Sequence, residues 1–224
     1  MRKGKWFGAG PTPRLGRPVS AIGVAVFGVG LAYGAMSTSN GLPFWFAPGL
    51  GIVVLAASAE MLFVGMVVTG ASPILALVST VLINVRHLPY GFAVADALGA
   101  DWRRWFRAHL INDESVAMAL SENDTYSRQY ALTATGLSIL VAWPLGAVIG
   151  GVVGHAVAAE TIGLDAAFPV VMLSLLAPHL TDRRMRGPLV VAMTAVAVAG
   201  IWLPSHIAIL AAVFFPIAVR GEQT

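Results

Sequence analysis

Long apolar runs, separated by short polar connections, fill most of this chain of 224 residues. A helix of about 20 apolar residues crosses the hydrocarbon core of a bilayer, so each long run is a candidate membrane span. The runs are continuously apolar and do not alternate every second residue, which favours helices over barrel strands. Only 11% of the residues are charged, against about 25% in a soluble domain. We therefore expect an all-α integral membrane protein.

The candidate spans set the expected architecture. The last three are short for a full crossing, which indicates tilt or broken helices. We expect a polytopic bundle of six to eight spans with at least one broken or re-entrant helix. It forms one transmembrane domain over residues 18–220, between a basic tail at 1–17 and a short tail at 221–224. The apolar runs cover 18–37, 43–69, 73–95, 129–158, 166–180, 188–203 and 206–219.

Basic residues gather at the ends of these runs, which predicts the orientation of the chain. They occur in the N-terminal tail, at 183–186 and at Arg220, so these parts are expected on the cytoplasmic side of the membrane. The loop 99–107 is also basic, yet three full crossings would place it outside. Either an early run is a re-entrant or broken pair, or the stretch 109–120 crosses.

Several classes of function are disfavoured by what the sequence lacks. It has no cysteine, which excludes disulfides, cysteine-bound zinc and iron–sulfur clusters. Its histidines never lie three or four residues apart, so no helical metal site is expected. No serine nucleophile motif or P-loop lysine is present, which argues against a hydrolase or an ATPase. No basic surface interleaved with aromatic residues indicates nucleic-acid binding. We expect neither an enzyme nor a bound cofactor.

Glycines recur inside the apolar runs. Gly30 and Gly34, and likewise Gly146 and Gly150, have the GxxxG spacing that lets membrane helices pack closely. The spacing is compatible with packing inside this subunit or with docking of a second membrane subunit.

The first polar patch within an apolar run is LAASAEMLFVG, which contains Glu60. A carboxylate at membrane depth is costly unless it is paired, protonated or in contact with water. Glu60 is therefore a candidate for proton coupling, or alternatively the partner of Arg86 in a structural ion pair. Ser58 can supply a hydroxyl to a nearby site, or can bond to its own helix.

The second patch is LINVRHLPYG. Asn84 and His87 share a helix face that Tyr90 continues, whereas Arg86 points about 160° away from Asn84 and must face another helix or a cavity. Pro89 removes a backbone donor and predicts a helix break. The positive end of a half-helix beginning near Pro89, together with Arg86, would form a cradle for a carboxylate. The alternative is that Arg86 and His87 extend to a membrane surface.

The third patch is LINDESVA. Asp113 and Glu114 diverge by about 100° on a helix, so we expect one to pair with Arg86 or Arg107 and the other to face solvent. An acidic cluster at a helix N-cap is the alternative interpretation.

These patches occur in order within a wider set of stretches: VGLAYGA, AASAEML, NVRHLPYG, LINDESVA and GLDAAFPVVMLSLL. Together they resemble the AzlC family of branched-chain amino acid permeases, the large subunits of two-component exporters. Many relatives differ in having glutamine at the position of Glu60 and an apolar residue at that of Pro89.

The resemblance implies export of valine, leucine, isoleucine and methionine together with a small AzlD-type membrane subunit. The rival hypothesis is a non-transporting scaffold that stabilises the small subunit. Combined with the polar patches, the resemblance predicts substrate binding by Arg86, Asn84, Pro89, Tyr90, Ser58 and Asp113, and proton coupling by Glu60, His87 and Glu114.

Overall fold

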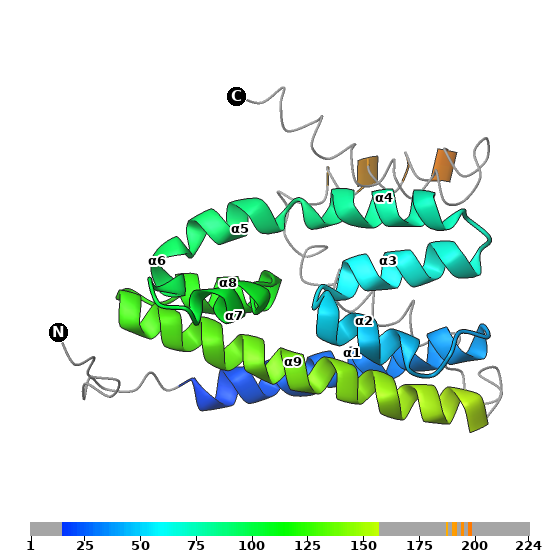
Figure 1. Cartoon of the computed structure of the whole chain (residues 1–224), viewed down its shortest axis with the longest axis horizontal. Helices are drawn as coiled ribbons and strands as arrows, with labels where there is room; N and C mark the ends of the chain where they lie inside the picture. The colour runs from blue at the N-terminus through cyan, green and yellow to red at the C-terminus, as the bar shows by residue number, and fades with distance from the viewer. Residues whose placement is uncertain (1–14, 157–186, 188–189, 192–193, 195–196, 199–224) are drawn as a thin grey trace.

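The computed structural model of the protein describes residues 15–156 and the separate positions 187, 190–191, 194 and 197–198 (Figure 1). Its described part is helical, and three helices, Gly16–Ser39, Pro73–Ala93 and Thr125–Gly154, are long and apolar enough to cross a membrane. The expected all-α transmembrane class is thus confirmed. The predicted cytoplasmic tail, the basic stretch 183–186 and most of the last three apolar runs lie outside the described residues.

Local sequence signals explain several helix starts. Ser72 caps α4 by accepting the Leu75 N–H at 3.3 Å, and Pro73 takes the first helical position, where a missing N–H costs nothing. Asp124 accepts the Ser127 N–H at 3.0 Å at the start of α9, and hydrogen bonds from Ser127 lower the pKa of Asp124. The helices are α1 (Gly16–Ser39), α2 (Phe46–Val53), α3 (Ala57–Val68), α4 (Pro73–Asn84), α5 (His87–Ala93), α6 (Ala95–Leu98), α7 (Arg104–His109), α8 (Asp113–Leu120) and α9 (Thr125–Ala156).

The helices α1 and α9 run side by side in backbone contact (Figure 1). A Cβ atom added at Gly30 would lie 2.7 Å from the Trp143 carbonyl oxygen, and one at Gly34 would clash with the carbonyl oxygen of Ala147. Gly150 is equally close to the backbone of Leu31. The GxxxG pairs of the two helices therefore pack against each other within this subunit, as one of the two interpretations predicted.

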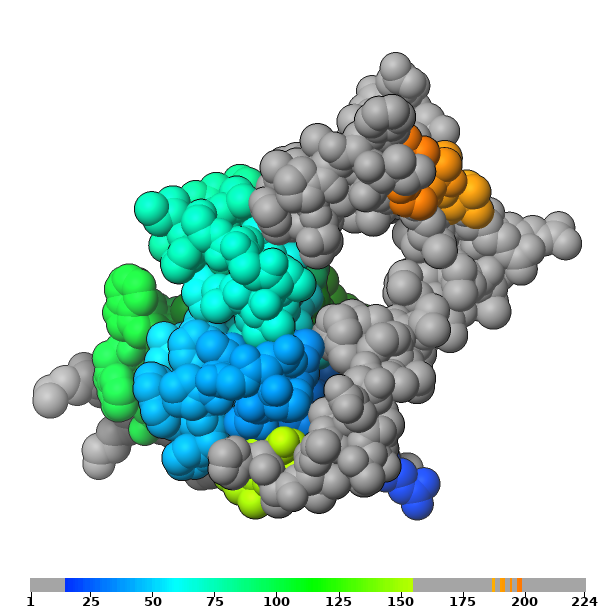
Figure 2. Space-filling view, turned by 90° about the vertical axis from the view of Figure 1, so that its right-hand side faces the viewer, coloured from blue at the N-terminus to red at the C-terminus, as the bar shows by residue number. Residues whose placement is uncertain are grey.

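The apolar run 43–69 does not cross the membrane as one helix. It divides into α2 and α3, of 8 and 12 residues, or about 12 Å and 18 Å in length, short of the ~30 Å of a bilayer core. Leu55, with φ +52°, makes the turn between them. The outer ends of α2 and α3 lie at the same end of the molecule (Figure 1), and both contribute to the surface seen from that end (Figure 2). We call this re-entrant pair the first hairpin.

The next helices bring the chain back to the end where α1 begins. The α4–α5 segment, Pro73–Ala93, is long enough to cross, and α6 lies beside the start of α9 (Figure 1), where Arg128 pairs with Asp96 at 3.3 Å. The basic loop 99–107 therefore lies at the same end as the start of α1. Of the two alternatives for this region, the re-entrant pair is the correct one.

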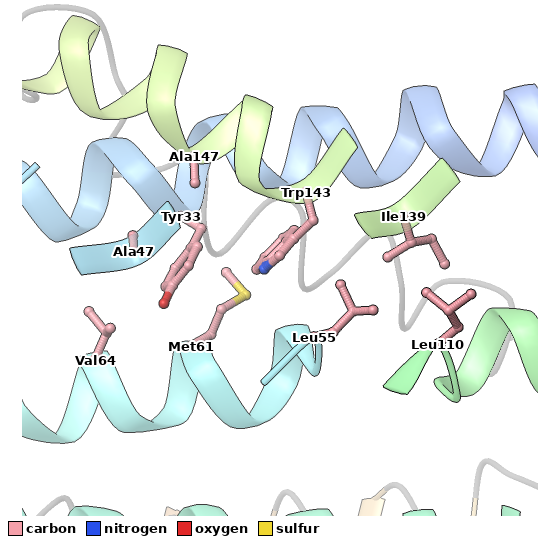
Figure 3. Close-up of a cluster of buried hydrophobic side chains, with 9 residues drawn as sticks. All are labelled: Tyr33, Ala47, Leu55, Met61, Val64, Leu110, Ile139, Trp143 and Ala147. Atoms are coloured by element: carbon pink, nitrogen blue, oxygen red, sulfur yellow. The ribbon is translucent and has the colours of Figure 1, made fainter. Parts of the chain in front are cut away.

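A second hairpin enters from this opposite end. It consists of α7 and α8, about 9 Å and 12 Å long, with 6 and 8 residues. Its tip meets the tip of the first hairpin, where Nε2 of His109 lies 2.8 Å from the carbonyl oxygen of Ile52. Leu55 and Leu110, one from each tip, belong to a buried cluster that also contains Trp143 of α9 (Figure 3). Two short hairpins thus meet inside the bundle.

Candidate functional site

A group of four polar side chains occupies the place where the hairpins meet α4 and α5. One guanidinium nitrogen of Arg86, Nη2, donates to Ser58 Oγ at 2.6 Å and lies 2.8 Å from Asp113 Oδ2. The Tyr90 hydroxyl donates to Asp113 Oδ1 at 2.6 Å. We call Ser58, Arg86, Tyr90 and Asp113 the polar junction. The side chains of Arg86 and Asp113 are 35% and 42% exposed.

Three helices begin at the polar junction. Ser58 lies in the first turn of α3, Asp113 is the first residue of α8, and Arg86 directly precedes α5. The first N–H groups of a helix have no intrahelical partner and carry a partial positive charge. Together with Arg86 they make this region favourable for a carboxylate, and Asp113 supplies one in the structure.

The helix break that places Arg86 lies slightly earlier than the sequence predicted. α4 ends at Asn84 and α5 begins at His87, so Pro89 is the third residue of α5 and not its start. The N–H groups of the first helical turn have no intrahelical partner, so the N–H that proline lacks is not needed at this position. The helix can therefore begin before Pro89. The predicted break is confirmed, and the expectation that Arg86 faces other helices is correct.

Asn84 and His87 line the same break. His87 Nδ1 lies 3.1 Å from the backbone carbonyl of Asn84, and the His87 ring meets the Tyr90 ring edge-on at 5.8 Å, so the predicted shared face exists. Asn84 Oδ1 and Arg86 Nε are buried atoms without a hydrogen-bond partner among the described residues. Unpartnered polar atoms of this kind are rare in proteins, and here they adjoin the polar junction.

Glu60 lies apart from the polar junction, in the buried face of the first hairpin. It is 1% exposed, and its two oxygens accept the Ala56 N–H and the Trp143 indole N–H, each at 2.9 Å. The alternative of a Glu60–Arg86 ion pair is therefore wrong, since Arg86 pairs with Asp113. The carboxylate ties the tip of the first hairpin to α9.

Trp143 and Tyr33 are the partners that the sequence analysis missed. Their rings stack with centroids 5.0 Å apart and planes 10° from parallel, and Tyr33 interacts electrostatically with Glu60. Both residues resemble ordinary aromatic filling of an apolar run. A signal was nevertheless present, because a tryptophan in mid-span carries an N–H that needs an acceptor when buried.

The acidic residues of the third patch separate, as the sequence predicted. Asp113 joins the polar junction, whereas Glu114 is exposed on α8. Asn112 and Ser115 form a capping box, with the Ser115 N–H 2.8 Å from Asn112 Oδ1, so the N-cap interpretation also holds for part of the patch. Arg107 is not a partner of this patch, because it pairs with Asp101 at 2.8 Å.

Metal binding finds no support in the part of the chain that the structure describes, where no three His, Asp or Glu side chains come together. What the polar junction offers instead is one cation, one anion and two hydroxyls. This set can bind a small polar solute by charge and hydrogen bonding. It has no activated nucleophile.

Comparison with known proteins places these features in a family. The family model described as AzlC protein matches residues 21–157. An uncharacterized membrane protein of Haemophilus influenzae is 23% identical over 67% of this chain and 64% of its own length. The branched-chain amino acid transport protein AzlC of Bacillus subtilis is 28% identical over 61% of this chain and 55% of its own length. The matches thus span less than two thirds of either relative.

No solved structure matches the chain. The family match covers more than half of the 224 residues, and it includes all four residues of the polar junction together with Glu60 and Trp143. The chain therefore belongs to the AzlC family.

Proposed function

We propose that this protein is the large membrane subunit of a secondary transporter that exports the branched-chain amino acids valine, leucine and isoleucine, and also methionine. The observation that carries the proposal is the half-exposed Arg86–Asp113 pair where two re-entrant hairpins meet inside an apolar bundle. Ionisable residues at such a depth commonly mark a solute path, and broken helices at the midplane are typical of transporter binding sites. The name of the Bacillus subtilis relative supports the substrate class.

In this proposal the solute carboxylate binds Arg86 and the first turns of the surrounding helices, and the ammonium binds Asp113. Ser58 and Tyr90 hold these two charged groups, at 2.6 Å in each case. Asn84 offers an unpartnered oxygen beside them, and Pro89 keeps the first turn of α5 short of one donor.

Proton coupling is the proposed energy source, with Glu60, His87 and Glu114 as the carriers. Glu60 is the most deeply buried of the three, and taking up a proton would remove a charge from a low-dielectric site. Exchange of its proton requires that Trp143 or the Ala56 backbone move away from the carboxyl group. His87 adjoins the polar junction, and Glu114 is open to solvent.

The assembly we propose contains a small AzlD-type membrane subunit and lies in the bacterial inner membrane with the N-terminus in the cytoplasm. The start of α1 and the basic loop 99–107 lie at the same end of the molecule (Figure 1). This supports the proposed orientation, because basic residues gather on the cytoplasmic side of a membrane.

Efflux of preloaded labelled leucine tests the transport function in cells that carry this protein with its small partner. We expect Arg86→Gln and Asp113→Asn to reduce efflux at least about tenfold at normal membrane levels, since each leaves one charge of the solute without its counterpart. Arg128→Gln is the matched control, because Arg128 forms an ion pair of similar exposure with Asp96, outside the polar junction. Efflux in Arg86→Gln equal to wild type would place the site elsewhere.

Two further outcomes separate the alternatives. A lower membrane level of the small partner in Arg86→Gln, together with leucine efflux from cells that carry wild-type partner without this chain, would support the scaffold function. For the coupling step, Glu60→Gln should uncouple efflux from an imposed pH gradient. If wild-type efflux does not respond to that gradient, proton coupling is refuted while the transport function stands.

A further inference from the structure

We propose that the Arg86–Asp113 ion pair is an internal substitute for a zwitterionic solute, so that the site selects molecules with both a free carboxylate and a free ammonium, and that binding exchanges this pair for two pairs with the solute. The inference rests on the proposed transport function and adds the charge rule by which the site selects. It also identifies the motion that binding starts.

The first argument is the state of the two charged groups. Asp113 has both oxygens engaged, Oδ1 by Tyr90 and Oδ2 by Arg86. Arg86 meets Asp113 and Ser58 through Nη2, while its Nε is buried without a partner. A carboxylate that takes over the guanidinium can therefore gain a donor that the internal pair does not use, and its arrival releases Asp113 Oδ2 for an ammonium.

The second argument is charge balance. With Arg86 and Asp113 both ionised, the polar junction is neutral, and it lies within an apolar bundle where an unpaired charge is costly. A zwitterion converts one ion pair into two and leaves every charge with a partner. A solute with a carboxylate alone would leave Asp113 unpaired, and a solute with an ammonium alone would leave Arg86 unpaired. The site should therefore reject both, whatever their apolar side chain.

The third argument concerns motion. Arg86 lies at the α4–α5 break and bonds through one nitrogen to Ser58 of the first hairpin and to Asp113 of the second. A solute that enters between Arg86 and Asp113 must increase their 2.8 Å separation. Asp113 is the first residue of α8, so this separation moves the tip of the second hairpin away from the α4–α5 segment that carries Arg86. Binding and opening are then the same event.

The test compares three competitors with the same branched side chain in leucine exchange, measured in membrane vesicles that contain the full chain with its small partner. The competitors are unlabelled leucine, the α-keto acid of leucine, and isoamylamine, which lacks the carboxylate. For wild type we expect inhibition by leucine alone. This comparison needs no variant, so it does not depend on the folding of one.

Charge-removing variants then invert the selectivity. Asp113→Asn removes the ion-pair partner of Arg86, and the keto acid should become an inhibitor at least about tenfold stronger than it is on wild type, a change of ~1.4 kcal/mol. Arg86→Gln should gain the corresponding sensitivity to isoamylamine. Asp96→Asn, which breaks the ion pair at the end of the bundle, should leave the wild-type selectivity unchanged.

The outcomes distinguish this inference from the function on which it rests. If the keto acid or the amine inhibits leucine exchange in wild type as strongly as unlabelled leucine does, the inference is overturned and the transport function stands. The selectivity of the two charge-removing variants is measured by competition of each inhibitor with a fluorescent or radioactive leucine bound to the purified protein. Selectivity equal to that of wild type in both variants would also overturn the inference. Absence of leucine exchange in wild type would refute the transport function and this inference together.

Discussion

Replacing Trp143 with phenylalanine should release the first hairpin from α9. The indole N–H of Trp143 donates to a Glu60 oxygen at 2.9 Å, and both side chains are 1% exposed. Phenylalanine keeps an aromatic ring against Tyr33 but leaves that oxygen without this donor. A hydrogen bond to a charged group contributes about 1.5–3 kcal/mol, so we expect a loss of about 2 kcal/mol. For a chain of this length that corresponds to a fall in the melting temperature of roughly 4–8 °C.

Thermal unfolding of the detergent-solubilised protein, followed by the fraction that remains monodisperse, measures this change. Trp45→Phe is the matched control, because Trp45 is 61% exposed, and it should shift the midpoint by less than about a quarter as much. In a Glu60→Gln background the Trp143→Phe change should cost less, since the remaining acceptor is neutral. Equal costs in both backgrounds would refute the reasoning that the charged hydrogen bond holds the hairpin.

Three further predictions concern the packing and the topology. Gly34→Leu should destabilise the protein by about 3 kcal/mol or more through a clash with the α9 backbone, whereas Gly28→Leu should be tolerated because nothing lies within 4 Å of a Cβ there; thermal unfolding of both variants checks this. Single cysteines at Asn40 and Ser72, placed in a chain that has none, should react with a membrane-impermeant thiol reagent from the same side, and labelling from opposite sides would rule out the re-entrant hairpin. Asp124→Ala should lower stability at neutral pH. Because the pKa of Asp124 is lowered in the folded state, its contribution is present above the ordinary aspartate pKa and is lost as the pH falls through the lowered value, so wild type and variant should converge in acid.

The sequence predicted much of the polar junction because the relevant signals are local. The arginine before a proline in LINVRHLPYG indicated a break and a side chain directed at other helices, and the structure has both. The divergence of Asp113 and Glu114 on a helix predicted that only one of them would pair with an arginine, but it left open which one and with which arginine. The structure pairs Asp113 with Arg86 and leaves Glu114 exposed.

The hairpin topology and the environment of Glu60 could not be predicted in the same way. An apolar run of 27 residues over 43–69 has the same composition whether it crosses or turns back. The turn is made by Leu55, a residue type without any turn preference. The Glu60–Trp143 hydrogen bond joins positions 83 residues apart. Such a pair depends on how α9 is rotated against α1, and the glycine contacts between these helices set that rotation. The GxxxG spacing indicates that these glycines make helix contacts, but it does not say which glycine meets which residue.

The glycine contacts between α1 and α9 also determine which parts of the protein can move. Two helices that touch through their backbones cannot slide by a fraction of a turn, since each small residue would meet a carbonyl group; the next fit is a whole turn, about 5.4 Å, away. The pair thus forms a rigid support, against which the two short hairpins can move. A binder that clamps the two hairpin tips together should therefore arrest the protein in one state without unfolding it, whereas a larger residue between α1 and α9 should destabilise the fold itself.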